Sequence, residues 1–253
     1  MKLRRGPVFL FALASVIALA CTDLSGSSTG VLSIQFDSLA APSVVLGDTL
    51  RDTTGAVVIP SVHAFNFKGE EITSVPVRFQ SPDSGIVVDS VTGTVFGDSL
   101  RSTAARIVAS VGSLQAVQKV DVTLRPDLLS AVTGRDSLSY SLVDSTLNVS
   151  PKLSVKLTHG VAPDDSAVKS YIVSFAIVSQ SDPGLGSLVS DGGKPSFVDT
   201  TDATGVAARA IRLHPVFLVS ETDSIIVFAT ARYRGIAVSG SPVRLVLKIK
   251  PRS

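Results

Sequence analysis

From residue 31 onward, apolar and polar residues alternate along the chain with a period of two. The alternating stretches are 32–36, 75–79, 120–124, 138–142, 153–157, 171–177 and 243–249. Successive side chains of a β-strand point to opposite faces of a sheet, so each stretch buries one face and exposes the other. No sustained stripe with the 3.6-residue period of a helix follows residue 21. The chain is therefore predicted to be all-β, in the form of antiparallel β-sandwiches.

The composition indicates a folded chain that is stabilised by apolar burial. The 253 residues are 45% hydrophobic and 17% charged, which excludes wholesale disorder. The single cysteine, Cys21, excludes an intramolecular disulfide and a cysteine-based zinc site. Each sandwich must therefore depend on buried apolar surface, which contributes about 25 cal/mol per Å².

The pattern breaks near Pro126 and then restarts, which predicts two domains, at 31–126 and 127–253. Three landmarks occur in the same order in both parts: an aromatic strand, a turn with Asp and Gly, and an Ala-rich alternating strand. They lie at 75–79 and 172–177, at 87–93 and 197–205, and at 103–111 and 206–213. A repeat of about one hundred residues has the size of one immunoglobulin-like sandwich.

These motifs carry a family resemblance. Residues 31–125 resemble a bacterial Ig-like domain of group 2, and residues 136–250 resemble the group 1, invasin-like variant. The group 2 motifs are Gly47-Asp48, 64–69, 77–79, 81–83, 89–95, 105–112 and 120–122, and the group 1 motif is 201–207. Members of the first family usually carry Trp where this chain has Phe79. The resemblance implies two tandem Ig-like sandwiches.

Two short segments, 89–93 and 202–205, have the composition of tight turns. Each begins with an Asp that can cap the turn and ends with a Gly, Gly93 or Gly205, that is expected to adopt positive φ. Apolar alternation on both sides predicts that each turn closes a hairpin.

The first twenty residues are typical of a secretory signal peptide. The basic segment 1–5 precedes an unbroken apolar run, 7–20, which ends in small residues. A run of 14 residues is shorter than the roughly 20 that a membrane-spanning helix needs. The alternative is a short anchor that stays attached. Removal of the signal takes three of the 23 basic residues and leaves 20 against 21 acidic residues, so no basic surplus indicates a nucleic-acid partner.

Cys21 follows Ala18-Leu19-Ala20, and this segment resembles the lipobox of bacterial lipoproteins. The resemblance implies that Cys21 becomes the acylated N-terminus and binds a membrane through its acyl chains. Residues 21–30 would then be the lipidated cysteine and a flexible, Ser/Gly-rich tether. Thr22, where an Asp would retain an enterobacterial lipoprotein at the inner membrane, favours the outer membrane. The alternative for Cys21 is a free buried thiol.

Two motifs match catalytic signatures without their structural context. Residues 26–30 match G-x-S-x-G but lie in the tether, where no strand-turn-helix is expected. Ser166 and Lys169 match S-x-x-K, but neither of its partner motifs occurs in the sequence. We interpret both as chance matches and predict no catalytic residues.

No metal or cofactor site is predicted either. His63, His159 and His214 lie far apart and are interpreted as structural or surface residues, although a Ser-His-Asp triad assembled in three dimensions stays open. Asp199 and Asp202 form the best candidate for a calcium loop, but a capped turn explains them as well.

Together these features predict an exported, lipid-anchored cell-envelope protein, placed at the outer membrane, with a structural or adhesive role through binding. The partner would be a protein or a glycan, bound at loops far from the membrane or at an open sheet edge. The alternatives are a carbohydrate-binding module and a non-catalytic accessory subunit of an envelope enzyme, because sandwiches serve many functions.

Overall fold

The structure is a computed structural model that describes residues 30–214 and 223–251. In these residues it consists of strands, turns and one short 3₁₀ segment, Ser145–Leu147, so the predicted all-β class is confirmed. No helix in the described part is long and apolar enough to cross a membrane. The predicted signal peptide, Cys21 and residues 22–29 of the tether lie outside the described residues.

The N-terminal sandwich contains eight strands. They are β1 (Ser33–Phe36), β2 (Ser43–Val45), β3 (Val62–Phe65), β4 (Arg78–Gln80), β5 (Ile86–Val88), β6 (Val95–Gly97), β7 (Ala105–Val111) and β8 (Leu114–Thr123). One sheet has the order β2-β8-β7-β4, and β1-β3 and β5-β6 form two-stranded sheets. Their apolar faces enclose a core that includes Val44, Leu50, Phe79, Val95 and Ile107.

The C-terminal sandwich contains the remaining strands. They are β9 (Leu128–Thr133), β10 (Arg135–Tyr140), β11 (Leu153–His159), β12 (Ser166–Ala167), β13 (Ile172–Ser179), β14 (Gly186–Val189), β15 (Val198–Thr200), β16 (Val206–Leu213), β17 (Ser224–Thr230), β18 (Arg232–Tyr233), β19 (Ile236–Ala237) and β20 (Val243–Pro251). One sheet has the order β10-β20-β17-β13-β15. The facing sheet has the order β12-β11-β16-β14, with β9 also paired to β11.

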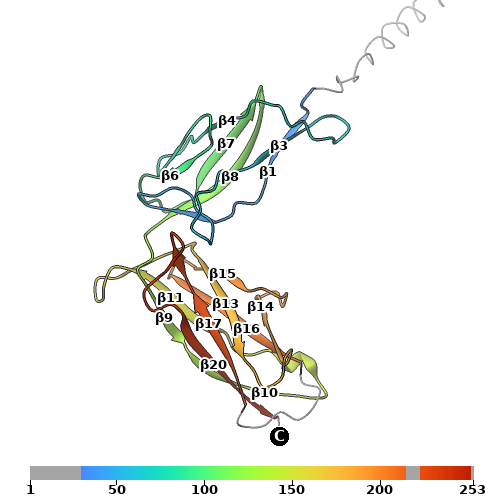
Figure 1. Ribbon diagram of the computed structural model, residues 1–253, viewed down its shortest axis with the longest axis vertical. Coiled ribbons are helices and arrows are strands. Elements are labelled where there is room, and N and C mark those ends of the chain that lie inside the picture. The colour runs from blue at the N-terminus through green and yellow to red at the C-terminus, as the bar shows by residue number, and fades with distance from the viewer. Residues whose placement is uncertain (1–29, 215–222, 252–253) are drawn as a thin grey trace, which may run out of the picture.

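The period of two in the sequence appears directly as alternating burial. In β20, Leu245, Leu247 and Ile249 are fully buried, while Lys248 and Lys250 between and beyond them are exposed. This second core surrounds Tyr140 and Phe175 and is separate from the first. Figure 1 shows the two sandwiches end to end, with β1 and the end of β20 at opposite tips. The domain limits 31–126 and 127–253 stay a prediction at the level of single residues.

Three details differ from the sequence-based expectations. Leu142 was expected to continue the buried stripe of β10, but it is 52% exposed because the chain leaves the strand at Ser141. The Asn148 side chain accepts the Ser141 backbone N–H at 2.7 Å and fixes that departure. Leu124 packs against the second core instead of the first. The sheets are also not wholly antiparallel, because β2 pairs with β8, and β10 with β20, in parallel.

The predicted internal repeat is wrong at its last landmark. Strand β7 pairs with β4 and β8, but its expected counterpart β16 pairs with β11 and β14 in the sheet opposite β13. The positive φ predicted for Gly93 and Gly205 is confirmed, at 76° and 80°. The turn at 89–93 joins the paired strands β5 and β6, whereas the turn at 202–205 carries the chain from one sheet to the other and closes no hairpin.

Candidate functional site at the junction of the sandwiches

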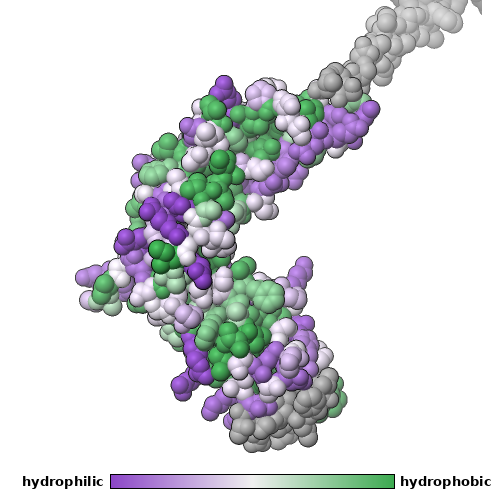
Figure 2. All heavy atoms as spheres, viewed as in Figure 1, coloured by the Kyte–Doolittle hydropathy of each residue, from purple (hydrophilic) through white to green (hydrophobic). Residues whose placement is uncertain are grey.

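A cavity of about 270 Å³ lies where the two sandwiches meet, and residues of both line it. The space-filling view shows the molecule hollowed on one side between the two bodies (Figure 2). The N-terminal sandwich contributes β2 and the residues before and after it, and the C-terminal sandwich contributes the start of β13, the end of β17 and the β18–β19 hairpin. The lining includes Asp48, Arg51, Tyr171, Tyr233 and Arg234.

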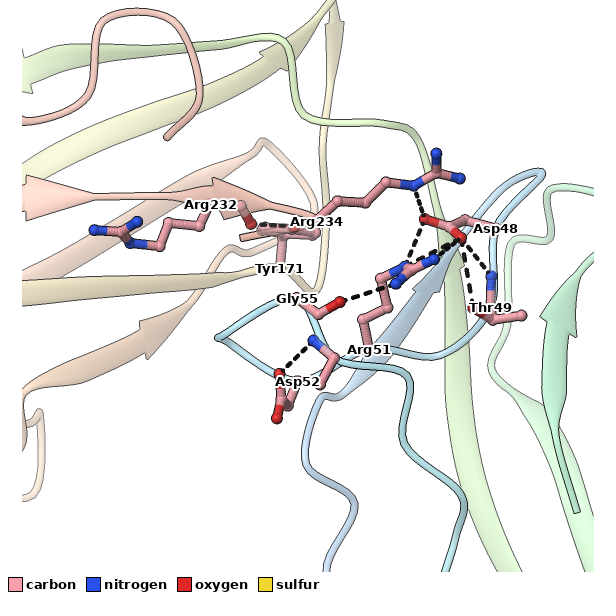
Figure 3. Close-up of polar contacts among 9 residues, drawn as sticks. Asp48, Thr49, Arg51, Asp52, Gly55, Tyr171, Arg232 and Arg234 are labelled. Atoms are coloured by element: carbon pink, nitrogen blue, oxygen red, sulfur yellow. Dashed lines mark hydrogen bonds and ion pairs between the residues drawn. The ribbon is translucent and has the colours of Figure 1, made fainter. Parts of the chain in front are cut away.

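Asp48 is the centre of this junction (Figure 3). The residue is 4% exposed and follows Gly47, whose φ of 75° turns the chain after β2. Arg51 donates from Nε to the Asp48 carboxylate at 3.1 Å, and Arg234 donates from Nε of the other sandwich at 2.8 Å. The Thr49 backbone N–H donates to the same carboxylate at 2.8 Å. We call Asp48, Arg51 and Arg234 the Asp48 cluster.

The cluster keeps the Asp48 carboxyl ionised. Burial alone raises the pKa of this carboxyl, but the hydrogen bonds from Arg234, Arg51 and Thr49 outweigh burial and hold the pKa well below its usual range. The two guanidinium groups supply the hydrogen bonds that a buried carboxylate would otherwise need from water. The Asp48 carboxylate therefore stays charged at neutral pH and can pair with Arg234 across the junction.

Beside the cluster, two glycine-bearing turns meet backbone to backbone. Arg51 also donates to the Gly55 carbonyl at 2.9 Å, which holds the turn at 52–55 against the β18–β19 hairpin. A Cβ atom added to Gly55 would lie 2.2 Å from the Gly235 backbone nitrogen, and one added to Gly235 would lie 2.6 Å from the Thr54 carbonyl oxygen. The close approach requires glycine on both sides of the junction.

A second set of contacts joins the sandwiches near β12 and β13. Ser43 Oγ donates to the Ser170 carbonyl at 2.6 Å, and Ser170 Oγ donates to Asp121 Oδ2 at 2.7 Å. Lys169 Nζ donates to the Arg101 carbonyl at 3.0 Å. The two sandwiches are thus tied by two separate sets of contacts.

Backbone strain is concentrated at these ties. Within residues 30–214 and 223–251, the non-glycine residues with positive φ are Ser170, at 54°, and Arg234, at 50°. Both make hydrogen bonds to the N-terminal sandwich. Such a conformation costs about 1–3 kcal/mol and persists only where the surroundings determine it. The sequence contains no glycine or asparagine at either position to reveal it.

Two tyrosines, Tyr171 and Tyr233, line the cavity. The Tyr171 hydroxyl donates to the Arg232 carbonyl at 2.6 Å, and burial raises the pKa of this phenol. Burial and a hydrogen bond with Asp48 raise the pKa of Tyr233 as well. Both phenols stay protonated, and their hydroxyl groups are engaged within the protein, Tyr171 with Arg232 and Tyr233 with Asp48.

The sequence-derived catalytic candidates do not converge on the junction cavity. Ser166 lies in β12, and Lys169 is bound across the junction rather than beside Ser166 on a helical face. His159 pairs with Asp127 at 2.6 Å, and His214 contacts Ser187 at 3.1 Å. Of the 26–30 motif, only Gly30 belongs to the described part of the chain.

The calcium candidates are engaged by protein groups. Asp199 accepts the Ala208 backbone N–H at 2.8 Å and pairs with Arg209 at 2.9 Å. Asp202 caps its turn by accepting the Thr204 and Val206 backbone N–H groups. Among the residues that the structure describes, no group of three or more His, Cys, Asp or Glu side chains is arranged to hold a metal ion.

His63 has partners that its sequence neighbourhood did not reveal. Its Nδ1 lies 2.6 Å from Glu71, and its Nε2 lies 2.9 Å from Asp37 and 3.3 Å from Ser61 Oγ. Ser61, His63 and Glu71 therefore have the order of a catalytic triad. However, Asp37 lies closer to Nε2 than Ser61 does, so this nitrogen carries its proton for Asp37 and does not accept one from Ser61. The group is a surface ion network.

This network predicts a pH dependence. Hydrogen bonds to Glu71 and then Asp37 raise the pKa of His63 above its ordinary 6.5, and His63 lowers the pKa of Asp37 below 3.8. The His63 contribution to stability is complete below pH 6.5 and lost as the pH rises through the raised pKa. The Asp37 contribution is lost as the pH falls through its lowered pKa.

We expect His63→Gln to lower the melting temperature slightly at about pH 5 and less at about pH 9. An equal effect at both pH values would contradict this.

No protein-family model and no curated protein matches this chain. Among solved structures, domains 4 and 5 of the S-layer protein SbsC align over 87% of this chain and 98% of that one, at 14% identity and a TM-score of 0.30. Human protocadherin-24 EC1-2 aligns over 88% of this chain and all of that one, at 13% identity and a TM-score of 0.27.

Proposed function

We propose that the protein is a lipid-anchored cell-envelope protein with a structural or adhesive role, in which two Ig-like sandwiches act as a stiff spacer that presents a binding surface. The observation that carries this proposal is the doubly tied junction. Domains joined by an ordinary linker are expected to move relative to one another. Here the Asp48–Arg234 ion pair, the hydrogen bonds of Ser170 and the close contact of Gly55 with Gly235 oppose such motion.

The direction of the spacer follows from the positions of the chain ends. The described chain begins, in blue before β1, at the end of the N-terminal sandwich that faces away from the junction, and β20 ends at the opposite tip of the molecule (Figure 1). A lipid on Cys21 would therefore leave the N-terminal sandwich near the membrane. The C-terminal sandwich would extend outward, where its loops and sheet faces are accessible to a partner.

The proposal predicts that Cys21→Ser releases the protein from the membrane. Without the thiol no diacylglyceryl group can be attached, and the remaining apolar run is removed or left unprocessed. We expect wild-type protein in the membrane fraction, with globomycin blocking its processing. The variant should appear as unprocessed precursor or in the soluble fraction.

Thr22→Ser is the matched control, because it changes the adjacent residue and keeps the thiol. The control should fractionate as the wild type does. If Cys21→Ser leaves both membrane fractionation and globomycin sensitivity unchanged, the lipid anchor is wrong.

A further inference from the structure

Four exposed cations surround one stretch of the outer sheet face of the C-terminal sandwich. Arg244, Lys248 and Lys250 lie on β20, and Arg135 lies on the neighbouring strand β10. The parallel pairing places Arg135 beside Val246, between Arg244 and Lys248. These side chains line an open groove of about 530 Å³, which we call the β10–β20 groove.

The cations of this groove have no ion-pair partner among the described residues. Elsewhere in the described chain, most junction and turn cations are paired, including Arg51, Arg106, Arg125, Lys152, Arg209 and Arg234. Among the described residues that line the groove, one is acidic: Asp136, which alternates to the other side of β10 and accepts the Ser137 backbone N–H at 2.7 Å. The groove therefore keeps a local positive charge in a mature chain that is predicted to be near neutral.

Protection of a sheet edge does not account for this arrangement. Lysines that prevent edge-to-edge aggregation lie on the edge strand itself. Here the edge strand is β10, whose outward positions after Arg135 are Ser137 and Ser139, and the lysines are one strand further in. Neighbouring like charges on one face destabilise a sheet, so an anionic ligand would relieve a cost that the fold carries.

The geometry of the groove favours an extended polymer. At about 3.3 Å per residue, Arg244 and Lys248 are about 13 Å apart along β20, and Lys248 and Lys250 are about 7 Å apart. The charges thus form a row along an open channel rather than a closed pocket. The short side chain of Ser137 leaves room over β10 and offers a hydroxyl to a ligand in the channel.

We infer that the β10–β20 groove binds an extended anionic polysaccharide whose carboxylate or phosphate groups contact these cations. A peptide gains affinity by pairing its backbone with a sheet edge, and the cations lie on a sheet face instead. Single-stranded nucleic acid is held by aromatic side chains on which bases stack, and no aromatic residue lines this groove. The inference names a ligand class for the binding role proposed above and rests on that role.

The test measures binding of the purified full chain, in detergent, to polygalacturonate and to poly(glycerol phosphate), with dextran as the neutral probe. We expect binding to at least one anionic polymer and none to dextran. Affinity should fall by about tenfold or more between about 50 and about 200 mM NaCl, as several charge contacts require. The carboxylate and phosphate arms distinguish the two sources of negative charge.

Charge reversal in the groove locates the binding surface. Lys248→Glu with Lys250→Glu should weaken binding by about tenfold or more, and Lys248→Arg with Lys250→Arg should retain it. The matched control, Lys68→Glu with Lys119→Glu, reverses the charge of two lysines that are exposed on the N-terminal sandwich. It should change the affinity less than twofold. Lys248→Gln with Lys250→Gln provides a milder variant if charge reversal impairs folding.

Three results would overturn the inference: no binding to either anionic polymer, equal binding by the Gln variant and the wild type, or tighter binding to single-stranded DNA or polyglutamate. Equal binding by the variant and the wild type would leave a binding role in place and remove only this groove. Because the measurement uses purified protein, it does not depend on the outcome of the Cys21→Ser fractionation.

Discussion

Phe175→Ala is expected to lower the free energy of unfolding of the C-terminal sandwich by about 3–5 kcal/mol. Phe175 is 2% exposed and lies in β13, in the middle of the second core. Truncation removes the transfer free energy of the ring and leaves a cavity that the surrounding strands can fill only in part. Because β13 pairs with both β15 and β17, its backbone cannot easily move into that space.

Phe197→Ala is the matched control for this change. Phe197 has the same ring but is 65% exposed, and its carbonyl accepts the Phe175 backbone N–H without involving the side chain. Its truncation should cost less than about 0.5 kcal/mol. Urea denaturation and scanning calorimetry measure both variants. A loss below about 1 kcal/mol for Phe175→Ala would contradict the packing described here.

Calorimetry also tests the separation of the two cores. The first core contains Phe79, and the second contains Phe175, and no buried residue belongs to both. Phe175→Ala should therefore lower the transition of the C-terminal sandwich and leave that of the N-terminal sandwich nearly unchanged, apart from the coupling through the junction.

The strands could be predicted because each one needs only local information. Alternation marks β13 and β20 because a half-buried strand must present apolar side chains on one face. The prediction that Leu142 is buried was wrong because β10 ends at Tyr140, before the alternating pattern ends. The side chain of Asn148, six residues after Leu142, holds the turn that ends the strand. Alternation predicts that a segment is a strand, but it does not predict the residue at which a side-chain hydrogen bond to the backbone ends that strand.

The internal repeat failed for a related reason. The Ala-rich segments 103–111 and 206–213 are similar because both become long strands that bury one face. That requirement is the same in either sheet of a sandwich, so composition does not reveal which sheet a strand joins. The pairing partners decide it, and they placed β7 beside β4 but β16 across from β13.

The junction could not be predicted from the sequence, although Asp48 belongs to one of the family motifs. The Gly47-Asp48 pair is one of the motifs that carry the resemblance to a bacterial Ig-like domain. Its main partner across the junction, Arg234, is 186 residues away. No periodicity or spacing rule connects such residues. The left-handed conformations of Ser170 and Arg234 were equally hidden, because these residue types rarely adopt them.

Gly55→Val is expected to open the junction. Its Cβ atom would overlap the Gly235 backbone, which cannot move away without displacing Arg234 from Asp48. The side chain would also strain a residue whose φ is 92°. We expect the maximum dimension and its spread in X-ray scattering to increase. Trypsin should cleave after Arg234 about tenfold faster or more, because the hairpin would lose its partner surface.

Gly69→Val separates the clash from the backbone strain. Gly69 also has positive φ, at 78°, but nothing lies within 4 Å of an added Cβ, so this variant carries the conformational cost alone. It should be destabilised by about 1 kcal/mol while its scattering profile and tryptic cleavage at Arg234 stay as in the wild type. Asp48→Ala, which removes the ion pair without a clash, should change both measurements in the same direction as Gly55→Val. If Gly55→Val and Gly69→Val behave alike, the contacts described at the junction do not fix the orientation of the two sandwiches, and the stiff spacer is wrong.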